Sequence, residues 1–172
     1  MSLHVPINGN DQKQGNLKAP LVLVEYGDYE CPYCGLAHPN IKKIQRYFGD
    51  DLLFVFRNFP LSEMHPHALT AARVAEAAAN QHKFWEVHDL IYENQENLYA
   101  EQLLQYARSA GADLKRLVAD MKSSKVINKV ETDMESGARS GVNGTPTFFI
   151  NGKRHKGDYD FDGLKTVMEE LL

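Results

Sequence analysis

Cys31 and Cys34 are the residues whose types and spacing point most directly to chemistry, and they are the only cysteines among 172 residues. They stand in the sequence Cys31-Pro32-Tyr33-Cys34, so two residues separate the thiols. Two thiols at this spacing can close a disulfide with each other or exchange one with another molecule. With no further cysteine there is no disulfide framework, and we interpret the pair as one redox unit.

An expected helix N-terminus at the cysteines favours this chemistry. Helix N-termini carry unpaired backbone N–H groups and the positive end of the helix dipole, and both stabilise a thiolate relative to a thiol. Cys31 lies at this end, so we expect its pKa to be lowered and its thiolate to attack. Cys34 follows most of a turn later on the same face, where it can resolve a mixed disulfide. Pro32 suits the first turn because its missing N–H would be unbonded there.

The elements that position the cysteines follow from the hydrophobic pattern. Residues 21–26 (LVLVEY) and 52–59 (LLFVFRNF) are short β-branched and aromatic runs that predict buried strands, and residues 36–48 between them have helical spacing. A βαβ unit this short implies parallel pairing. Asn151-Gly152, between TFFI and KRHK, predicts an antiparallel hairpin, and residues 161–172 predict a closing helix.

The middle of the chain shows helical patterns and no strand signal. The helical pieces are an alanine-rich run after Pro66, residues 84–92, 101–110 and 114–121, and a helix carrying Ile127, Val130, Met134 and Ala138 on one face. The order predicts an α/β protein with a thioredoxin-like fold and an all-helical insertion between the βαβ half and the ββα half. We divide it into a flexible N-terminal lead-in (1–18), a thioredoxin-like domain (19–61 and 139–172) and the helical insertion (62–138).

Composition bounds the class of protein. A hydrophobic content of 43% can bury one core without disulfide or metal staples. Lys and Arg number 19 against 23 Asp and Glu, so we expect no nucleic acid partner. No run approaches the roughly 20 apolar residues of a membrane span, and we expect no membrane insertion of this chain. Residues 1–20 lack a signal-peptide core, which indicates a cytoplasmic protein as written, or a periplasmic or extracellular one if an export signal was removed.

The sequence resembles the DsbA-like branch of the thioredoxin superfamily. The motifs that carry the resemblance are VEYGDYECPYCG at residues 24–35 and GVNGTPTFFING at residues 141–152, and it extends from about Ala19 to the end of the chain through HPHALTAARVAEAA at residues 65–78. More narrowly, the chain is similar to soluble bacterial thioredoxin-like domains found alone or fused behind sodium/proton antiporters. The resemblance implies a thiol:disulfide oxidoreductase with protein or small-thiol substrates and a redox partner of unknown identity.

The resemblance also implies roles for residues around the cysteines. It places a cis-proline opposite them at Thr145-Pro146, where the backbone pairs with an extended substrate peptide. Pro32 and Tyr33, between the two cysteines, are expected to face the substrate as well. Thr145, Pro146, Pro32 and Tyr33 are therefore the expected substrate-binding residues.

Glu25 is the third expected catalytic residue, because the family carries an acidic residue behind the cysteines at the matching position. Strand alternation puts Glu25 on the face of Leu21 and Leu23, so we expect a partly buried carboxylate. Burial would raise its pKa and let it take the proton from Cys34 during resolution.

We expect no cofactor and no metal, because the cysteine pair is itself the redox group. One alternative is a non-catalytic zinc- or peptide-binding module, in which zinc would need further ligands from His38 or from His65 and His67. We interpret His65 and His67 as capping or packing residues. A second alternative is an enzyme like the kappa-class glutathione transferases or the 2-hydroxychromene-2-carboxylate isomerases. There a serine typically replaces the first cysteine, and Cys31 argues against this.

The sequence leaves the direction of electron flow open. Pro32-Tyr33 differs from the Pro-His pair of the periplasmic oxidant for which the family is named, and equals the pair common in glutaredoxins. Oxidase, reductase and isomerase use the same atoms and differ in the relative stability of the dithiol and the disulfide. Substrate and oligomeric state are also open.

Overall fold

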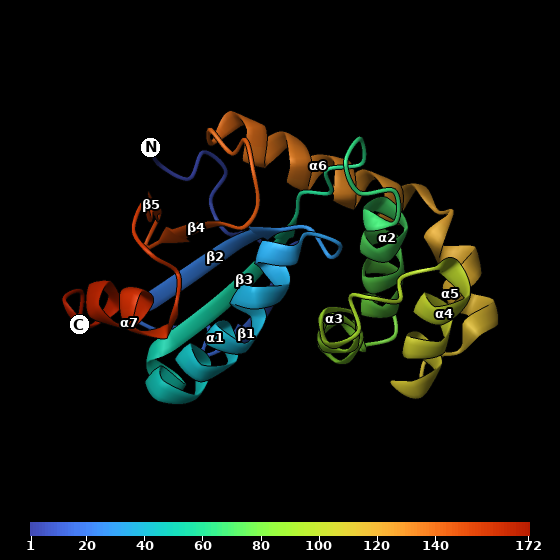
Figure 1. The fold of residues 1–172 in the computed structure, drawn as a ribbon, viewed down its shortest axis with the longest axis horizontal. Helices are drawn as coiled ribbons and strands as arrows, with labels where there is room; N and C mark the ends of the chain where they lie inside the picture. The colour runs from blue at the N-terminus through green and yellow to red at the C-terminus, as the bar shows by residue number, and fades with distance from the viewer.

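The computed structural model describes residues 1–172 as a five-stranded mixed sheet with seven α-helices around it (Figure 1). The strands are β1 (Gln12–Gly15), β2 (Leu21–Gly27), β3 (Leu52–Asn58), β4 (Thr147–Ile150) and β5 (Lys153–Arg154). The helices are α1 (Pro32–Phe48), α2 (Ala68–Ala79), α3 (Phe84–Glu93), α4 (Ala100–Ser109), α5 (Leu114–Met121), α6 (Ser124–Arg139) and α7 (Phe161–Glu169), with a 3₁₀ turn at Gly49–Asp51.

The sheet has the strand order β1-β3-β2-β4-β5. Strands β2 and β3 are parallel and joined through α1, while β4 is antiparallel to β2 and β5 is antiparallel to β4. These pairings confirm the predicted βαβ unit and the predicted hairpin. Asn151 and Gly152 have φ values of 47° and 82°, as a type I′ turn requires. Central strand β2 therefore delivers the chain directly to the cysteines at the start of α1.

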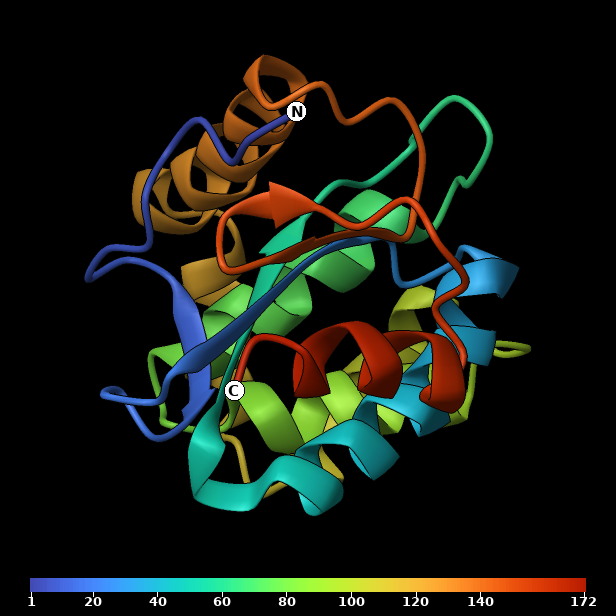
Figure 2. The same ribbon diagram turned by 90° about the vertical axis from the view of Figure 1, so that its left-hand side faces the viewer.

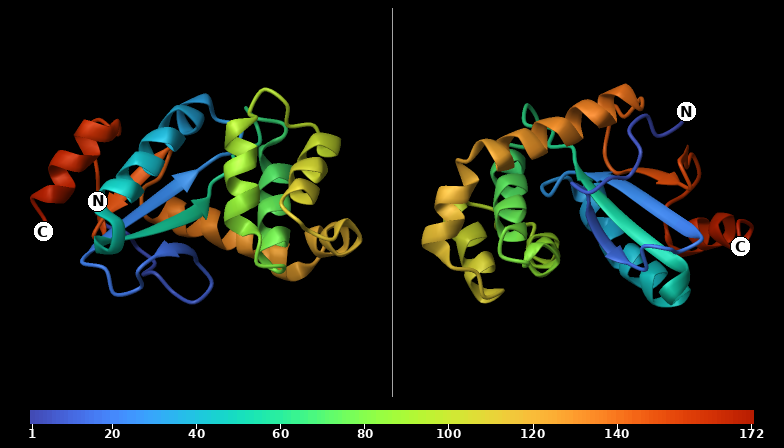
Figure 3. Two further views of the ribbon diagram at one scale, coloured as in Figure 1. Left: turned by 90° about the horizontal axis from the view of Figure 1, so that it is seen from below. Right: turned by 180° about the vertical axis from the view of Figure 1, so that it is seen from behind.

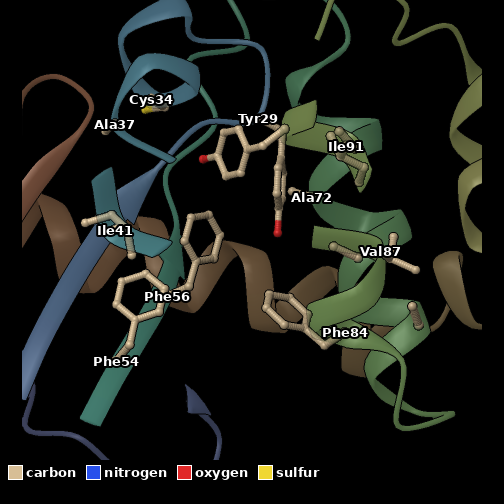
Figure 4. Close-up of a cluster of buried hydrophobic side chains, with 14 of the residues drawn as sticks. Tyr29, Cys34, Ala37, Ile41, Phe54, Phe56, Ala72, Phe84, Val87 and Ile91 are labelled. Atoms are coloured by element: carbon tan, nitrogen blue, oxygen red, sulfur yellow. The ribbon is translucent and has the colours of Figure 1, made fainter. Parts of the chain in front are cut away.

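The two faces of the sheet bury different clusters because side chains alternate along each strand. Leu21 and Leu23 of β2 face a large core with α1 and α7, and Val24 and Tyr26 face a smaller one on the other side. Figure 2 shows α1 and α7 next to each other. Figure 4 shows the large core continuing from Phe54 and Phe56 of β3 into the helices beside the sheet, through Phe84, Val87 and Ile91.

Helices α2 to α5 pack together at one end of the sheet, and α6 carries the chain back along it (Figures 1 and 3). This arrangement confirms the predicted thioredoxin-like fold with an all-helical insertion. The division of residues 19–61 and 139–172 from residues 62–138 stays a prediction. Both parts contribute side chains to one continuous core. None of the helices combines the length and the apolar character needed to cross a membrane.

The N-terminal segment differs from the expected flexible lead-in over residues 1–18. Its β1 pairs antiparallel with β3 at the edge of the sheet. The guanidinium of Arg57, 1% exposed, binds both carboxylate oxygens of Asp11 at 2.8 and 2.9 Å and donates to the carbonyls of Val5 and Pro6. The side chains of β1 stay half-exposed, so no hydrophobic alternation marked this strand, and long-range polar contacts fix its place.

Candidate functional site

Cys31 is the N-cap residue of α1, with Pro32 in the first helical position. The backbone N–H groups of Tyr33 and Cys34 are directed at the Cys31 sulfur, as expected at a helix N-terminus. Both thiols are free, and both cysteines are buried, at 3% and 0% exposure. The Cys34 thiol donates a hydrogen bond to Cys31, and this is the largest cause that lowers the pKa of Cys31 to about 5. Burial opposes the shift, and contacts from Thr145 and the two N–H groups support it.

Cys34 is shifted in the opposite direction. Burial is the largest cause that raises its pKa well above the ordinary value. The hydrogen bond to Cys31 and the negative charges of Glu25 and Cys31 raise it further, and only the backbone N–H of Asp28 opposes them. At neutral pH the pair is therefore one thiolate and one thiol, with the thiolate on the residue at the helix end.

Glu25 lies on the same face of β2 as Leu21 and Leu23, as strand alternation predicts, and its exposure is 3%. The side chain makes no hydrogen bond or ion pair. Burial is the main cause that raises the pKa of Glu25 to about 8, and the negative charge of Cys31 adds to the shift. A buried carboxyl group that changes protonation near neutral pH thus lies within electrostatic reach of both cysteines.

Thr145 and Pro146 face the cysteines from the start of β4, and the peptide bond between them is cis. The Cys31 sulfur lies 3.5 Å from the carbonyl oxygen of Thr145. The buried Thr145 hydroxyl has no partner in the dithiol form, yet it lies close enough to Cys31 to lower the pKa of the thiol. We infer that the Thr145 hydroxyl can donate a hydrogen bond to the Cys31 thiolate.

The surface next to Cys31 is open and partly apolar. Pro32 and Tyr33 are exposed, Tyr33 to 63%. Leu36, the first apolar residue of the helical pattern predicted for residues 36–48, is 68% exposed on the next turn of α1. A shallow cavity of about 340 Å³ lies beside Pro146 and reaches Tyr159. A second cavity, of about 460 Å³, is lined by residues 9–12, α2 and α6 and includes none of these residues.

Asp28 is a site residue that the sequence analysis missed. It follows β2 and is 1% exposed. Its carboxylate accepts hydrogen bonds from the backbone N–H of Glu30 at 2.8 Å and of Leu61 at 2.9 Å, and lies 2.7 Å from Nδ1 of His65. The HPH motif at residues 65–67 was the one available signal, and His65 packs against the cysteine turn rather than capping a helix.

The helical insertion also contacts the turn through polar groups that the sequence analysis missed. The Gln95 amide, just after α3, donates to the carbonyls of Tyr29 at 2.8 Å and Cys31 at 2.9 Å. The Tyr29 hydroxyl lies 2.9 Å from Nδ1 of buried His88. No sequence pattern marks these contacts, because each joins segments more than 50 residues apart.

His38 packs inside the protein, stacked on Tyr92, with Nε2 3.8 Å from Asp89 Oδ1. Burial is the main cause that lowers the pKa of His38 to about 4. The negative charge of Asp89 opposes this shift, and the positive charge of Lys42 adds to it. Lys42 Nζ lies 2.8 Å from both carboxylate oxygens of Asp89. His38, His88 and Asp89 form the one group of three potential metal ligands, and it contains neither cysteine.

Comparison with known proteins shows the family of the chain. The chain matches the model of a family described as thioredoxin over residues 8–170. It is 45% identical over 161 residues to the Na(+)/H(+) antiporter NhaA 1 of Mycolicibacterium vanbaalenii, covering 92% of this chain and 26% of the relative. It is 42% identical over 170 residues to the Na(+)/H(+) antiporter NhaA of Herminiimonas arsenicoxydans, covering 98% and 27%. The chain spans about a quarter of the length of the curated relatives it matches.

Solved structures share the whole fold. A thioredoxin-like oxidoreductase from Silicibacter pomeroyi superposes with a TM-score of 0.86 at 26% identity, covering 95% of this chain and 92% of that one. Oxidised BdbD from Bacillus subtilis gives 0.84 at 27% identity, covering 94% and 92%. The thiol-disulfide exchange protein alpha-DsbA2 from Wolbachia pipientis gives 0.85 at 21% identity, covering 96% and 89%, and shows the fold alone. Together these similarities support an oxidoreductase function in general terms.

Proposed function

We propose that this chain, which belongs to the thioredoxin family and to its DsbA-like branch, is a thiol:disulfide oxidoreductase that works through Cys31 and Cys34. The observation that carries the proposal is the opposite shift of the two thiols within one helical turn. The pKa of Cys31 is lowered to about 5, and the pKa of Cys34 is raised. Exchange needs one thiolate to attack and one thiol that is held in reserve.

In the first step the Cys31 thiolate attacks a disulfide of the substrate. The substrate S–S bond breaks, a mixed disulfide forms at Cys31, and one substrate sulfur leaves as a thiolate that takes a proton from water. The Thr145 hydroxyl and the N–H groups of Tyr33 and Cys34 stabilise the attacking thiolate before this step.

In the second step Cys34 loses its proton and attacks the Cys31 sulfur. The mixed disulfide breaks, the second substrate sulfur leaves as a thiolate, and the Cys31–Cys34 disulfide forms. Two electrons have then passed from the pair to the substrate. Run in reverse, the same steps oxidise a substrate dithiol.

Glu25 is the proposed base for Cys34. The negative charge of Cys31 is one cause of the raised pKa of Glu25. That charge disappears when Cys31 enters the mixed disulfide, so Glu25 becomes ionised more easily at the step that needs a base. It is buried and bound to no other partner, and is therefore free to take the proton.

Substrate is proposed to dock against the segment that leads into β4, at Thr145 and the cis-proline Pro146. The Thr145 carbonyl lies beside the Cys31 sulfur, and the cavity at Pro146 lies next to this segment. An extended segment of a protein or a small thiol that pairs there would bring its sulfur to Cys31. Exposed Pro32 and Tyr33 border the same position and offer apolar contact.

The proposed redox group is the cysteine pair, without a cofactor, and a second thiol or disulfide protein would restore its starting state. The proposal concerns the part that this chain matches in longer proteins named Na(+)/H(+) antiporters. Those names describe the whole proteins, of which this part is about a quarter.

Trapping of mixed disulfides tests the assignment of the two cysteines. In a Cys34→Ser variant the intermediate at Cys31 cannot be resolved, so incubation with oxidised glutathione should leave one glutathione on Cys31, detected by mass spectrometry of the intact protein. The matched Cys31→Ser variant should accumulate much less adduct, because Cys34 is buried and keeps its proton. Equal labelling of the two variants would contradict the proposal.

A further inference from the structure

We propose that His65, bound to the buried carboxylate of Asp28, is a positioning residue that supplies a positive charge to the cysteine turn and thereby favours the Cys31 thiolate. This inference rests on the proposed function and adds to it a residue from outside the CPYC motif. It gives a role to the HPH motif at residues 65–67, which the mechanism above leaves unused.

Asp28 holds the turn together through contacts in both directions. Its carbonyl accepts a hydrogen bond from the backbone N–H of Cys31 at 3.1 Å, and its own N–H is directed at the sulfur of Cys34. Its carboxylate accepts from the N–H of Glu30. A displacement of Asp28 would therefore change the surroundings of both sulfur atoms.

The second half of the contact comes from the loop that follows β3. The Leu61 N–H and the His65 ring both bind Oδ2 of Asp28, at 2.9 and 2.7 Å. Side-chain exposure is 0% for Asp28 and 15% for His65. Three hydrogen bonds therefore converge on this one buried carboxylate.

The negative charge of Asp28 disfavours a thiolate at Cys31, and a positive charge on His65 offsets this effect. A buried carboxylate three residues before Cys31 opposes a second negative charge on the sulfur. An imidazolium at His65 neutralises that carboxylate, so Asp28 adds no net negative charge to the turn before the thiolate forms. The geometry thus makes the pair Asp28–His65 a condition for a stable thiolate rather than a contact of the scaffold alone.

The groups around His65 favour its charged form. Partial burial opposes the charge, but the hydrogen bond to Asp28, the charge of Asp28, and those of Cys31 and Glu30 together raise the pKa of His65 above 6.5. These are the titratable groups that face the ring, from the turn and from the start of α1. Between the pKa of Cys31 and that of His65, the two are present as thiolate and imidazolium.

His67 provides a matched control within the same motif. Its backbone N–H donates to Glu30 Oε1 at 3.1 Å, and its ring packs edge-on against Tyr99 at 4.9 Å. Its side chain makes no hydrogen bond to the turn. Replacement of His67 therefore changes the same loop without removing the positive charge that His65 places beside Asp28.

Removing the charge of His65 should destabilise the reduced form more than the disulfide form, because only the reduced form carries a negative charge at Cys31. In His65→Gln we expect the pKa of Cys31 to rise by about half to one unit. The equilibrium constant for reduction of the disulfide by glutathione should fall about three- to tenfold at pH 6 to 7. The variant would be the weaker oxidant.

The test compares the wild type with His65→Gln, His65→Lys and His67→Gln by thiolate absorbance against pH and by the glutathione equilibrium. His65→Lys should restore most of the wild-type pKa and equilibrium constant, since an ammonium can replace the imidazolium on Asp28. His67→Gln should remain within about twofold of the wild type. A merely structural role predicts instead that His65→Lys is as altered as His65→Gln, and that result would overturn the inference.

A measurement on the wild type needs no substitution. Linkage requires that if His65 stabilises the thiolate, the thiolate raises the pKa of His65 by the same amount. NMR titration of the His65 ring should therefore give a higher pKa in the dithiol form than in the disulfide form. Equal values in the two forms would refute the inference while leaving the redox cycle, shown by the same two preparations, intact.

Discussion

The buried polar groups of this protein occupy two regions that differ in how far their hydrogen-bonding capacity is used. Behind the sheet, Arg57 is bound by Asp11, by the Tyr26 hydroxyl and by two backbone carbonyls. Beside the cysteines, the Glu25 carboxyl, the Tyr92 hydroxyl and the Thr145 hydroxyl are buried, and none of them has a hydrogen-bond partner.

The same contrast appears in the pKa values. The hydrogen bonds and charge of Arg57 hold the pKa of Asp11 below its ordinary value in spite of burial, so this carboxylate stays ionised. Glu25 has no such partner and its pKa rises to about 8. Paired buried groups keep one protonation state and stabilise the fold, whereas unpaired ones can change theirs during a reaction.

The largest expected effect comes from breaking the paired region. An Arg57→Met variant leaves the Asp11 carboxylate buried without its partner and should lower the free energy of unfolding by about 3–5 kcal/mol. Urea denaturation measures this loss. The Cys31 pKa, measured in the folded protein, should stay unchanged. A shifted thiolate titration would show that the two regions are not independent.

Replacing Glu25 by Gln should have the opposite effect on stability. The pKa of Glu25 is raised from 4.5 to about 8 in the folded protein. The folded protein therefore keeps its full stability below pH 4.5, where the carboxyl is protonated in both states, and loses stability as the pH rises from there through about 8. Gln does not ionise, and the variant should be more stable than the wild type by about 3 kcal/mol at pH 7, with the difference vanishing near pH 4. Denaturation series at several pH values check this sign.

The same Glu25→Gln variant should be slower in resolving the mixed disulfide, by about 10²-fold if Glu25 takes the proton of Cys34. Stopped-flow release of the second thiol from a preformed mixed disulfide measures this step. A Leu23→Met variant on the same face of β2 controls for repacking. Resolution at the wild-type rate would leave the stability effect standing and remove Glu25 from the mechanism.

Thr145→Val tests the unpaired hydroxyl at the thiolate. Loss of one donor to an ion should raise the pKa of Cys31 from about 5 by about one unit. Thiolate absorbance against pH records the change. Thr147→Val is the matched control, since its hydroxyl binds the Gly144 carbonyl and not the cysteine. Unchanged titration in Thr145→Val would mean that the Cys34 thiol and the helix N–H groups suffice to stabilise the thiolate.

The smallest expected effect is at Tyr92. Its hydroxyl is buried without a partner, so Tyr92→Phe removes an unsatisfied group and should change the free energy of unfolding by less than about 1 kcal/mol, in the stabilising direction. Tyr26→Phe, whose hydroxyl binds Arg57 and Ser136, should destabilise instead. A marked loss of stability in Tyr92→Phe would show that this hydroxyl is not an unsatisfied group and that the two regions do not differ in this way.

The parts of this molecule that the sequence predicts are those with a local signal. Strands β2 and β3 are continuous apolar runs, Asn151-Gly152 supplies two residues suited to positive φ, and the cysteine spacing identifies the reactive pair. Strand β1 carried no such signal because its place depends on Arg57, more than 40 residues away. Asp28, His65 and Gln95 act through long-range polar contacts, which one sequence does not reveal.

The glutathione equilibrium of the Cys31–Cys34 pair measures whether the two cysteines form one redox couple with one thiolate and one thiol. The wild type should interconvert reversibly between dithiol and disulfide by transfer of two electrons. Its reduction potential should lie between that of strong oxidants, about −120 mV, and that of reductases, about −270 mV. The potential should also change slope with pH near the Cys31 pKa of about 5. A pair that does not cycle, or whose reduction potential changes with pH at one constant slope, would contradict the division of the pair into one thiolate and one thiol.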